Sequence, residues 1–335
     1  MEEEHRSYPL LMELAKRSRP PLRWLLILVA VVLMLLLVSV AFLDGDRASL
    51  ATLSFWRDLM DGPALIIYIL AVYPILYQRW WRSALSLRTL LSPDDKATMP
   101  VPLPKRQWEW TAIIVGSIFW PLLWQPWQRN WVPGDIWINA YDVGTQIVLF
   151  SLMGWIVYTV FIGNRYTNRL SRLRLNVDVF DTEPLMPIAR SSLGFSLAFI
   201  GGISLSLIFQ TQESLLRWAN LVVWAAVICF AILLFFVSMW SIHTVLAGLK
   251  KHELALVRQH LKTVSRRLNL SDVDGLGGKD EFSSTITALL IYEKRVKEAP
   301  EWPYNAGIIR ELMASTLVPI VVFLVKVISR LGIGT

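Results

Sequence analysis

The sequence predicts an all-α, polytopic membrane protein with about seven transmembrane helices and a cytoplasmic helical hairpin. Apolar stretches of helical length recur along the 335 residues, and 54% of the chain is hydrophobic. The mean hydropathy is +0.47 and only 18% of residues are charged, whereas soluble proteins carry about 25%. The 16 Trp are a further sign of a membrane, because indole rings prefer its interfaces.

The first apolar stretch is the clearest span, because no charge lies between Arg23 and Asp44. A helix of this length crosses a hydrocarbon core of roughly 30 Å. A cleavable signal peptide is the alternative, and Ser39-Val40-Ala41 resembles a cleavage site, but a signal's apolar region is only about 7–15 residues long. We therefore expect a retained helix. The full set of expected spans is 22–43, 62–78, 108–124, 143–163, 192–210, 218–247 and 309–328.

Basic residues predict the orientation, because cytoplasmic segments are enriched in Lys and Arg. With a cytoplasmic N-terminus, the inside segments hold 27 of the 33 basic residues, and the outside segments hold six. The inside segments are 1–23, 79–106, 165–190 and 250–310. The sequence therefore predicts a multi-pass protein of the cell (inner or plasma) membrane, with an external C-terminus. The net charge of +7 is explained by these loops and anionic lipid, and no nucleic-acid partner is expected.

Ionisable residues are scarce inside the expected spans. Those found are placed near span ends, and they are Glu109, Asp142, His243, Glu311 and Lys326. Proton- or ion-coupled transporters usually bury such a group near the midplane, so the pattern argues against that class. The fifth span carries small residues, which predict close helix packing or, alternatively, a wet seam or pore lining. They are Ser196, Gly201, Gly202, Ser204 and Ser206.

Tryptophans gather on the predicted outer face. Trp124, Trp127 and Trp131 stand in a segment broken by prolines, which excludes a plain helix. We expect an interfacial aromatic belt there, and a recognition surface for a lipid or partner is the alternative. Trp302 is expected at the headgroups on the opposite face.

A long helix is predicted from Leu216 to Leu268, which contains no proline and only Gly248 as glycine. Beyond Lys250 its apolar residues recur at steps of three and four, which is a heptad seam. This seam, the predicted interaction surface, consists of Leu254, Val257, Leu261, Val264 and Leu268. A second apolar stripe follows a glycine-rich turn, so we expect the two helices to form a hairpin. That stripe is Phe282, Ile286, Leu289 and Val296.

These elements divide the chain into four parts. They are a cytoplasmic tail (1–21), transmembrane helices one to six (22–248), the cytoplasmic hairpin (249–308), and the last span with the external C-terminus (309–335).

Signatures of enzymes are absent from the sequence: no phosphate-binding glycine loop, dinucleotide fingerprint, zinc-protease motif or nucleophile elbow occurs. Asp178, Asp181 and Glu183 allow a metal site, but pairing with arginines is the preferred interpretation. Asp272 opens a turn that matches a calcium loop poorly, because Ser283 stands where a glutamate is needed. We expect no enzyme activity, metal or cofactor.

Two motifs carry a resemblance over about a third of the chain. One is Glu301-Trp302-Pro303-Tyr304-Asn305 before the last span, and the other is Val177-Asp178-Val179-Phe180-Asp181 with Pro184, Pro187 and Arg190. Both resemble patterns in uncharacterised bacterial multi-spanning membrane proteins, although Asn305 stands where that pattern has Asp. The resemblance implies an architecture and a bacterial inner membrane, and no activity.

The expected function is structural, sensory or scaffolding, exerted through the cytoplasmic hairpin. An oligomeric channel or transporter is the alternative, and a lipid-handling protein comes third. The expected partners are membrane lipid and either a second copy of the chain or a cytoplasmic protein.

Overall fold

The computed structural model describes residue 9 and residues 22–91, 105–124, 135–171, 179–181, 183–210, 218–274, 279–302 and 306–330. All regular elements within these ranges are helical. The helices are α2 (Leu22–Leu43), α3 (Leu53–Leu59), α4 (Asp61–Thr89), α6 (Arg106–Trp124), α7 (Ile136–Ser171), α8 (Met186–Phe209), α10 (Trp218–Asp274), α11 (Lys279–Glu298) and α12 (Ala306–Arg330), with the 3₁₀ turns η1 (Ser49–Ala51) and η3 (Glu183–Leu185).

Within the described residues, five helical segments are long and apolar enough to cross a membrane. They are Leu22–Leu43, Asp61–Thr89, Ile136–Tyr166, Glu183–Phe209 and Gly307–Ile328. These segments overlap five of the spans expected from the sequence and support a location in a membrane. The other two expected spans fall on α6 and α10, which are not among the five, so the seven-span count stays a prediction.

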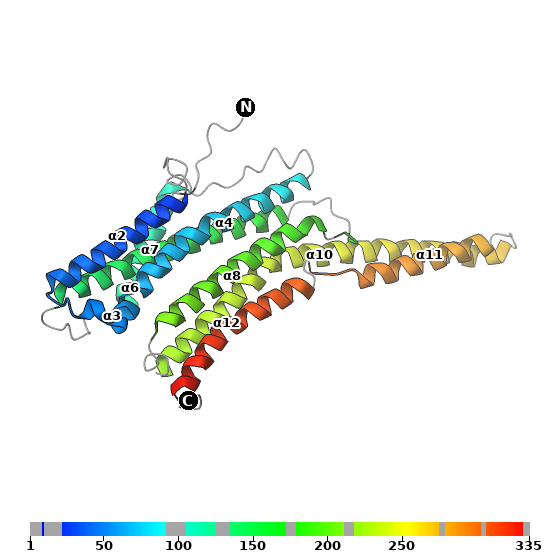
Figure 1. Cartoon of the computed structure of the whole chain (residues 1–335). Coiled ribbons are helices and arrows are strands. Elements are labelled where there is room, and N and C mark those ends of the chain that lie inside the picture. The colour runs from blue at the N-terminus through cyan, green and yellow to red at the C-terminus, as the bar shows by residue number, and fades with distance from the viewer. Residues whose placement is uncertain are drawn as a thin grey trace.

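The long helices form two groups, which contact each other through α4 with α8 and through α7 with α10 (Figure 1). On one side, α2 and α7 contact α4, and α6 packs along α7. On the other side, α8 contacts α4, α10 and α12. The C-terminal part of α10 continues past the bundle, and α11 lies against it there (Figure 1).

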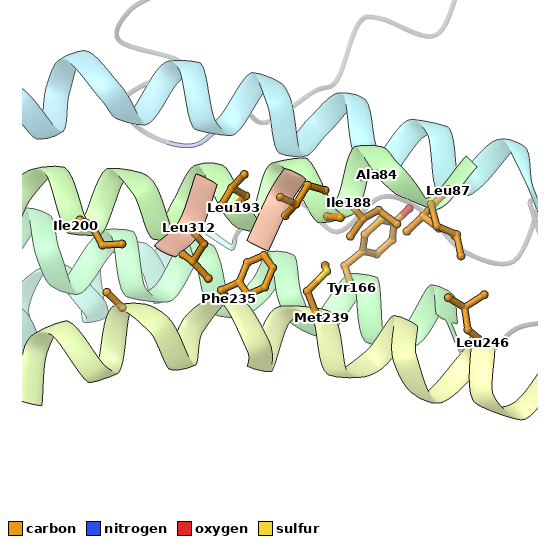
Figure 2. Close-up of a cluster of buried hydrophobic side chains, with 14 of the residues drawn as sticks. Ala84, Leu87, Tyr166, Ile188, Leu193, Ile200, Phe235, Met239, Leu246 and Leu312 are labelled. Atoms are coloured by element: carbon orange, nitrogen blue, oxygen red, sulfur yellow. The ribbon is translucent and has the colours of Figure 1, made fainter. Parts of the chain in front are cut away.

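The largest buried cluster lies where α8 meets α4, α10 and α12 (Figure 2). Its fully buried side chains include Leu87, Ile200, Phe235, Met239 and Leu246. Between helices in lipid, close packing and van der Waals contact supply the stabilisation, because the surrounding chains are as apolar as leucine. The opposite surfaces of α2 and α12 expose apolar side chains, which lipid would cover.

Asp44, just after α2, fixes the beginning of α7. Its carboxylate accepts hydrogen bonds from the backbone N–H groups of Trp137 (3.1 Å) and Ile138 (2.7 Å). The first N–H groups of a helix have no partner within it, so an external carboxylate stabilises this end. Tyr141, one turn further along, donates its hydroxyl to the Leu33 carbonyl at 3.1 Å. The two contacts hold α2 against α7.

Two glycines let α6 and α7 approach at backbone distance. A Cβ added at Gly154 would lie 2.5 Å from the Ala112 carbonyl oxygen and 3.0 Å from the Gly116 Cα. A Cβ at Gly116 would meet the Phe150 carbonyl oxygen. Small residues at such crossings are typical of helix association in membranes.

The small residues of α8 pack against α4. Tyr68 of α4 lies on Gly201 and donates its hydroxyl to the Ala198 carbonyl at 2.8 Å. Ser204 bonds to the Ile200 carbonyl of its own helix at 2.8 Å. These contacts favour the helix-packing interpretation of this stripe.

Candidate functional site

The candidate functional site is the projecting part of α10 together with α11. α10 is continuous for 57 residues, which corresponds to about 85 Å at about 1.5 Å per residue. The turn expected between α10 and α11, residues 275–278, lies outside the described residues, so the hairpin stays a prediction. What the structure shows is side-by-side packing of the two helices (Figure 1).

An apolar cluster joins the two helices near the bundle. Val296 and Ala299, at the end of α11, are buried together with Val179 from the segment before α8. Leu249 and Leu254 of α10 pack against this cluster. The cluster therefore fixes three segments, distant in sequence, at the base of the projecting part.

Ion pairs centred on Glu293 link α10 to α11. Its Oε1 accepts from Lys297 Nζ at 2.9 Å within α11 and from Arg258 Nε of α10 at 3.1 Å. The hydrogen bond from Lys297, followed by that from Arg258, lowers the pKa of Glu293 below its ordinary value of 4.5. Both basic partners are half exposed or more, so solvent screens this network. The network therefore contributes more to the alignment of α11 along α10 than to the stability of the fold.

A polar latch, formed by His243, Lys250, Glu301 and Trp302, holds the end of α11 against α10. Lys250 Nζ donates to the Ala299 carbonyl and to Glu301 Oε1, both at 3.0 Å. The His243 ring stacks on Trp302, with centroids 4.1 Å apart and planes inclined by 10°, and His243 Nδ1 lies 3.0 Å from the Glu301 carbonyl oxygen. The latch therefore fixes the point from which the chain enters α12.

The structure brings most of the predicted seam onto one described stretch of α10. Val257 is buried, whereas Leu254, Leu261 and Val264 are half-buried. The Leu268 side chain lies outside the described residues. Part of the seam is therefore already covered within the chain, and its role as an interaction surface stays a prediction.

Other apolar side chains remain uncovered on this element. Leu290 and Ile291 of α11 are 52% and 58% exposed, and Leu256 of α10 is 37% exposed. They lie beyond the five apolar segments that are long enough to span a membrane. None of them belongs to either of the two stripes predicted from the sequence.

Of the predicted interface tryptophans, only Trp302 has a described side chain. It is half-buried in the latch, with its ring also 6.5 Å from that of Trp240. Trp124 ends α6, and its side chain lies outside the described residues, as do Trp127 and Trp131. The aromatic belt stays a prediction.

The ionisable groups of the bundle have specific partners. Glu109 is 1% exposed and accepts a hydrogen bond from Trp155 Nε1 at 3.0 Å. It is therefore buried, although it lies near the end of the expected span. Lys326 donates to the Leu207 and Ile208 carbonyls at 2.6 and 2.9 Å and also to that of Gln210, so it caps the end of α8.

Asp61 is the residue that sequence analysis missed. Its Oδ2 accepts from Ser206 Oγ at 3.3 Å and lies 3.5 Å from Gln210 Nε2, while its Oδ1 is buried without a hydrogen bond. Gly62 and Pro63 follow it, so the sequence places it before the expected span rather than within a helix. Its burial depends on α8, more than 140 residues later in the chain.

In the described part of the chain, no group of three or more His, Cys, Asp or Glu side chains is placed to hold a metal ion. Comparison with known protein families, curated proteins and solved structures finds no match to this chain.

Proposed function

We propose that this protein is a membrane scaffold or sensor that works by assembling through its projecting α10–α11 element. The observation that carries the proposal is the exposure of Leu256, Leu290 and Ile291 on a part of the chain outside the apolar segments. Outside a membrane, exposed apolar side chains that gather in a patch mark protein contact sites, and Leu290 and Ile291 are neighbours on α11. The latch and the Glu293 ion pairs support a rigid presentation of this surface.

The proposed topology has seven spans, with the N-terminus and the hairpin in the cytoplasm and the C-terminus outside. The distribution of basic residues supports it. In a Cys229→Ala background, an impermeant thiol reagent added to intact cells should label a Cys placed at Asn130 or Gly334. Labelling at Lys279 would refute the orientation.

Assembly is tested by cross-linking and by mass. In the same background, Arg266→Cys on the exposed surface of α10 should give a specific disulfide or maleimide cross-link to a neighbour, either a second copy or another protein. Ile291→Lys should weaken this cross-link at least tenfold, because a charge on a buried contact is costly. Glu298→Lys is the control, since it places the same charge on an exposed polar position of α11.

Light scattering of the purified protein distinguishes the two kinds of partner. A second copy would give a mass of at least twice 38.3 kDa after subtraction of detergent. The absence of any trapped neighbour, or an unchanged cross-link in Ile291→Lys, would overturn the proposal.

The predicted seam is tested separately. Leu261→Asp, which is half-buried beside Val257, should increase proteolysis of the segment from 250 to 299, because a buried unpaired charge costs several kcal/mol. Unchanged proteolysis would mean that the seam is not buried.

An oligomeric channel or transporter remains the second candidate, and Asp61 is the observation that favours it. A buried carboxylate oxygen without a hydrogen bond resembles the ion-binding acids of transporters. Gradient-driven uptake by reconstituted liposomes that Asp61→Asn abolishes, together with a failure to cross-link Arg266→Cys, would favour this candidate.

A further inference from the structure

The inference concerns three arginines at the end of the bundle from which α10 projects. Arg79 and Arg82 belong to α4 and Arg190 belongs to α8, and these two helices pack side by side (Figure 1). All three side chains are exposed. Together they form an arginine cluster on the surface of the bundle.

Contacts between α4 and α8 place the arginines of the two helices opposite each other. A Cβ added at Gly194 of α8 would lie 3.8 Å from Arg79 Nη1, so the guanidinium group of Arg79 lies over this glycine. Arg190 stands four residues before Gly194, and residues four apart lie on the same face of a helix. Ser83 Oγ of α4 donates to the Pro187 carbonyl of α8 at 2.8 Å, which aligns the two helices at this level.

The charges of the arginine cluster are not balanced by a neighbouring carboxylate. Arg82 follows Arg79 by three residues, so the two side chains are neighbours on one face of α4. Neither of them, nor Arg190, forms an ion pair with a described residue. Like charges at such spacings destabilise a helix, so an anion bound between these side chains would stabilise this part of the fold.

The residue type indicates which anion would bind. A guanidinium group is planar, and its N–H donors match two oxygens of one phosphate group, whereas the ammonium group of lysine acts as a point charge. All three cations of the cluster are arginines. The chemistry therefore favours a phosphate group.

The level of the cluster indicates a lipid as the source of the phosphate. Both α4 and α8 belong to the five segments that are long and apolar enough to cross a membrane. The span expected in α4 ends at residue 78, directly before Arg79, and the span expected in α8 begins at residue 192, just after Arg190. The cluster therefore lies at the boundary of the hydrocarbon, beside the layer of polar headgroups.

An apolar side chain next to the cluster provides a contact for an acyl chain. Ile75 stands one turn before Arg79, on the same face of α4 and toward the apolar part of the span, and it is 53% exposed. An acyl chain that covers Ile75 gains from the burial of apolar surface, and a free phosphate ion does not. We propose that the arginine cluster of α4 and α8 binds the phosphate group of an anionic membrane phospholipid, with an acyl chain against Ile75.

Native mass spectrometry of the full chain tests this proposal with three probes. Palmitoyl-oleoyl-phosphatidylglycerol is the anionic lipid. Palmitoyl-oleoyl-phosphatidylcholine has the same phosphate and the same acyl chains but no net charge, and glycerol 3-phosphate has the phosphate without acyl chains. We expect the phosphatidylglycerol to bind more tightly than either of the other two probes.

Substitutions locate the bound lipid. Arg79→Gln and Arg190→Gln should each weaken the binding of phosphatidylglycerol about fivefold, which is the contribution of one basic residue at an anionic lipid surface. Arg165→Gln is the matched control, because Arg165 of α7 is also exposed and stands near Gly163, which packs against Trp80 at the level of the cluster. The control should leave lipid binding unchanged, and no variant should lower the thermal midpoint of the lipid-free protein.

Four results would each refute the proposal. Binding of phosphatidylcholine as tight as that of phosphatidylglycerol would mean that the charge of the lipid is not recognised. Equal weakening by Arg165→Gln and Arg79→Gln would assign the effect to the charge of the whole surface. Binding of glycerol 3-phosphate as tight as that of the lipid would make a soluble phosphate the ligand. An unchanged affinity in both Arg79→Gln and Arg190→Gln would place the lipid elsewhere on the protein.

Discussion

Replacement of Gly154 by alanine should separate α6 from α7. The added Cβ would lie 2.5 Å from the Ala112 carbonyl oxygen, and ordinary van der Waals contact begins at 3.4 Å. The helices must therefore move apart by about 0.9 Å at this crossing, because the atoms in contact belong to the backbone and no side chain can rotate away.

The change in the free energy of unfolding caused by Gly154→Ala is the sum of two opposing effects. Overpacking of this kind costs about 1–3 kcal/mol, while alanine is favoured over glycine inside a helix by about 0.5–1 kcal/mol. We expect a net loss of about 1–2 kcal/mol. An unfolding entropy of about 2.1 cal/mol/K per residue gives about 0.7 kcal/mol/K for the 335 residues, so the thermal midpoint should fall by about 1–3 °C.

Gly144→Ala is the matched control, because Gly144 lies on the same helix and a Cβ there meets nothing within 4 Å. Its midpoint should stay equal to that of the wild type or rise slightly. Tryptophan fluorescence during heating in nanodiscs at one fixed scan rate measures both variants, since unfolding of membrane proteins is often irreversible. A midpoint of Gly154→Ala at or above that of Gly144→Ala would refute the close crossing.

Three further predictions follow from polar contacts. Lys326→Met should destabilise the fold by about 1–3 kcal/mol, because the last carbonyls of α8 lose their donor, and a thermal midpoint no lower than that of the wild type would contradict this cap. Because hydrogen bonds from Lys297 and Arg258 lower the pKa of Glu293, its stabilisation is fully present above the unfolded pKa and is lost as pH falls through the folded value. The protection of the α11 amides, corrected for the intrinsic exchange rate at each pH, should therefore decrease as pH falls below about 4.5; Glu293→Gln should remove this dependence. Glu109→Ala should leave Trp155 Nε1 without its acceptor and cost about 1–3 kcal/mol, whereas Glu109→Gln, which keeps an acceptor oxygen, should cost less than half as much; equal losses would show that charge matters more than the hydrogen bond.

Local hydrophobicity was enough to predict the apolar helices. The first expected span, 22–43, coincides with α2, because an uncharged apolar run between Arg23 and Asp44 has no alternative partner for its backbone groups in lipid. The helices α4 and α7 extend well past the expected spans, to Thr89 and Ser171. Hydropathy predicts the apolar part of a helix. It does not predict the polar turns by which the same helix continues beyond that part.

Contacts between distant segments could not be predicted from one sequence. The Glu109–Trp155 hydrogen bond joins residues 46 apart, and the Asp61–Ser206 contact joins residues 145 apart. The residues around Asp61 do not indicate that Ser206 lies beside it in the fold, so the burial of Asp61 could not be predicted from the sequence.

The continuity of α10 gives the protein a mechanical property. About 24 residues separate Lys250, in the latch, from the end of the helix at Asp274, which is a lever arm of about 36 Å at about 1.5 Å per residue. A tilt of about 5° at the latch would displace the far end by roughly 3 Å, which is comparable to the one-turn and interface shifts that switch other proteins. Small rearrangements among packed helices in the bundle would thus be magnified into a change of position that a partner at the tip of the lever can detect.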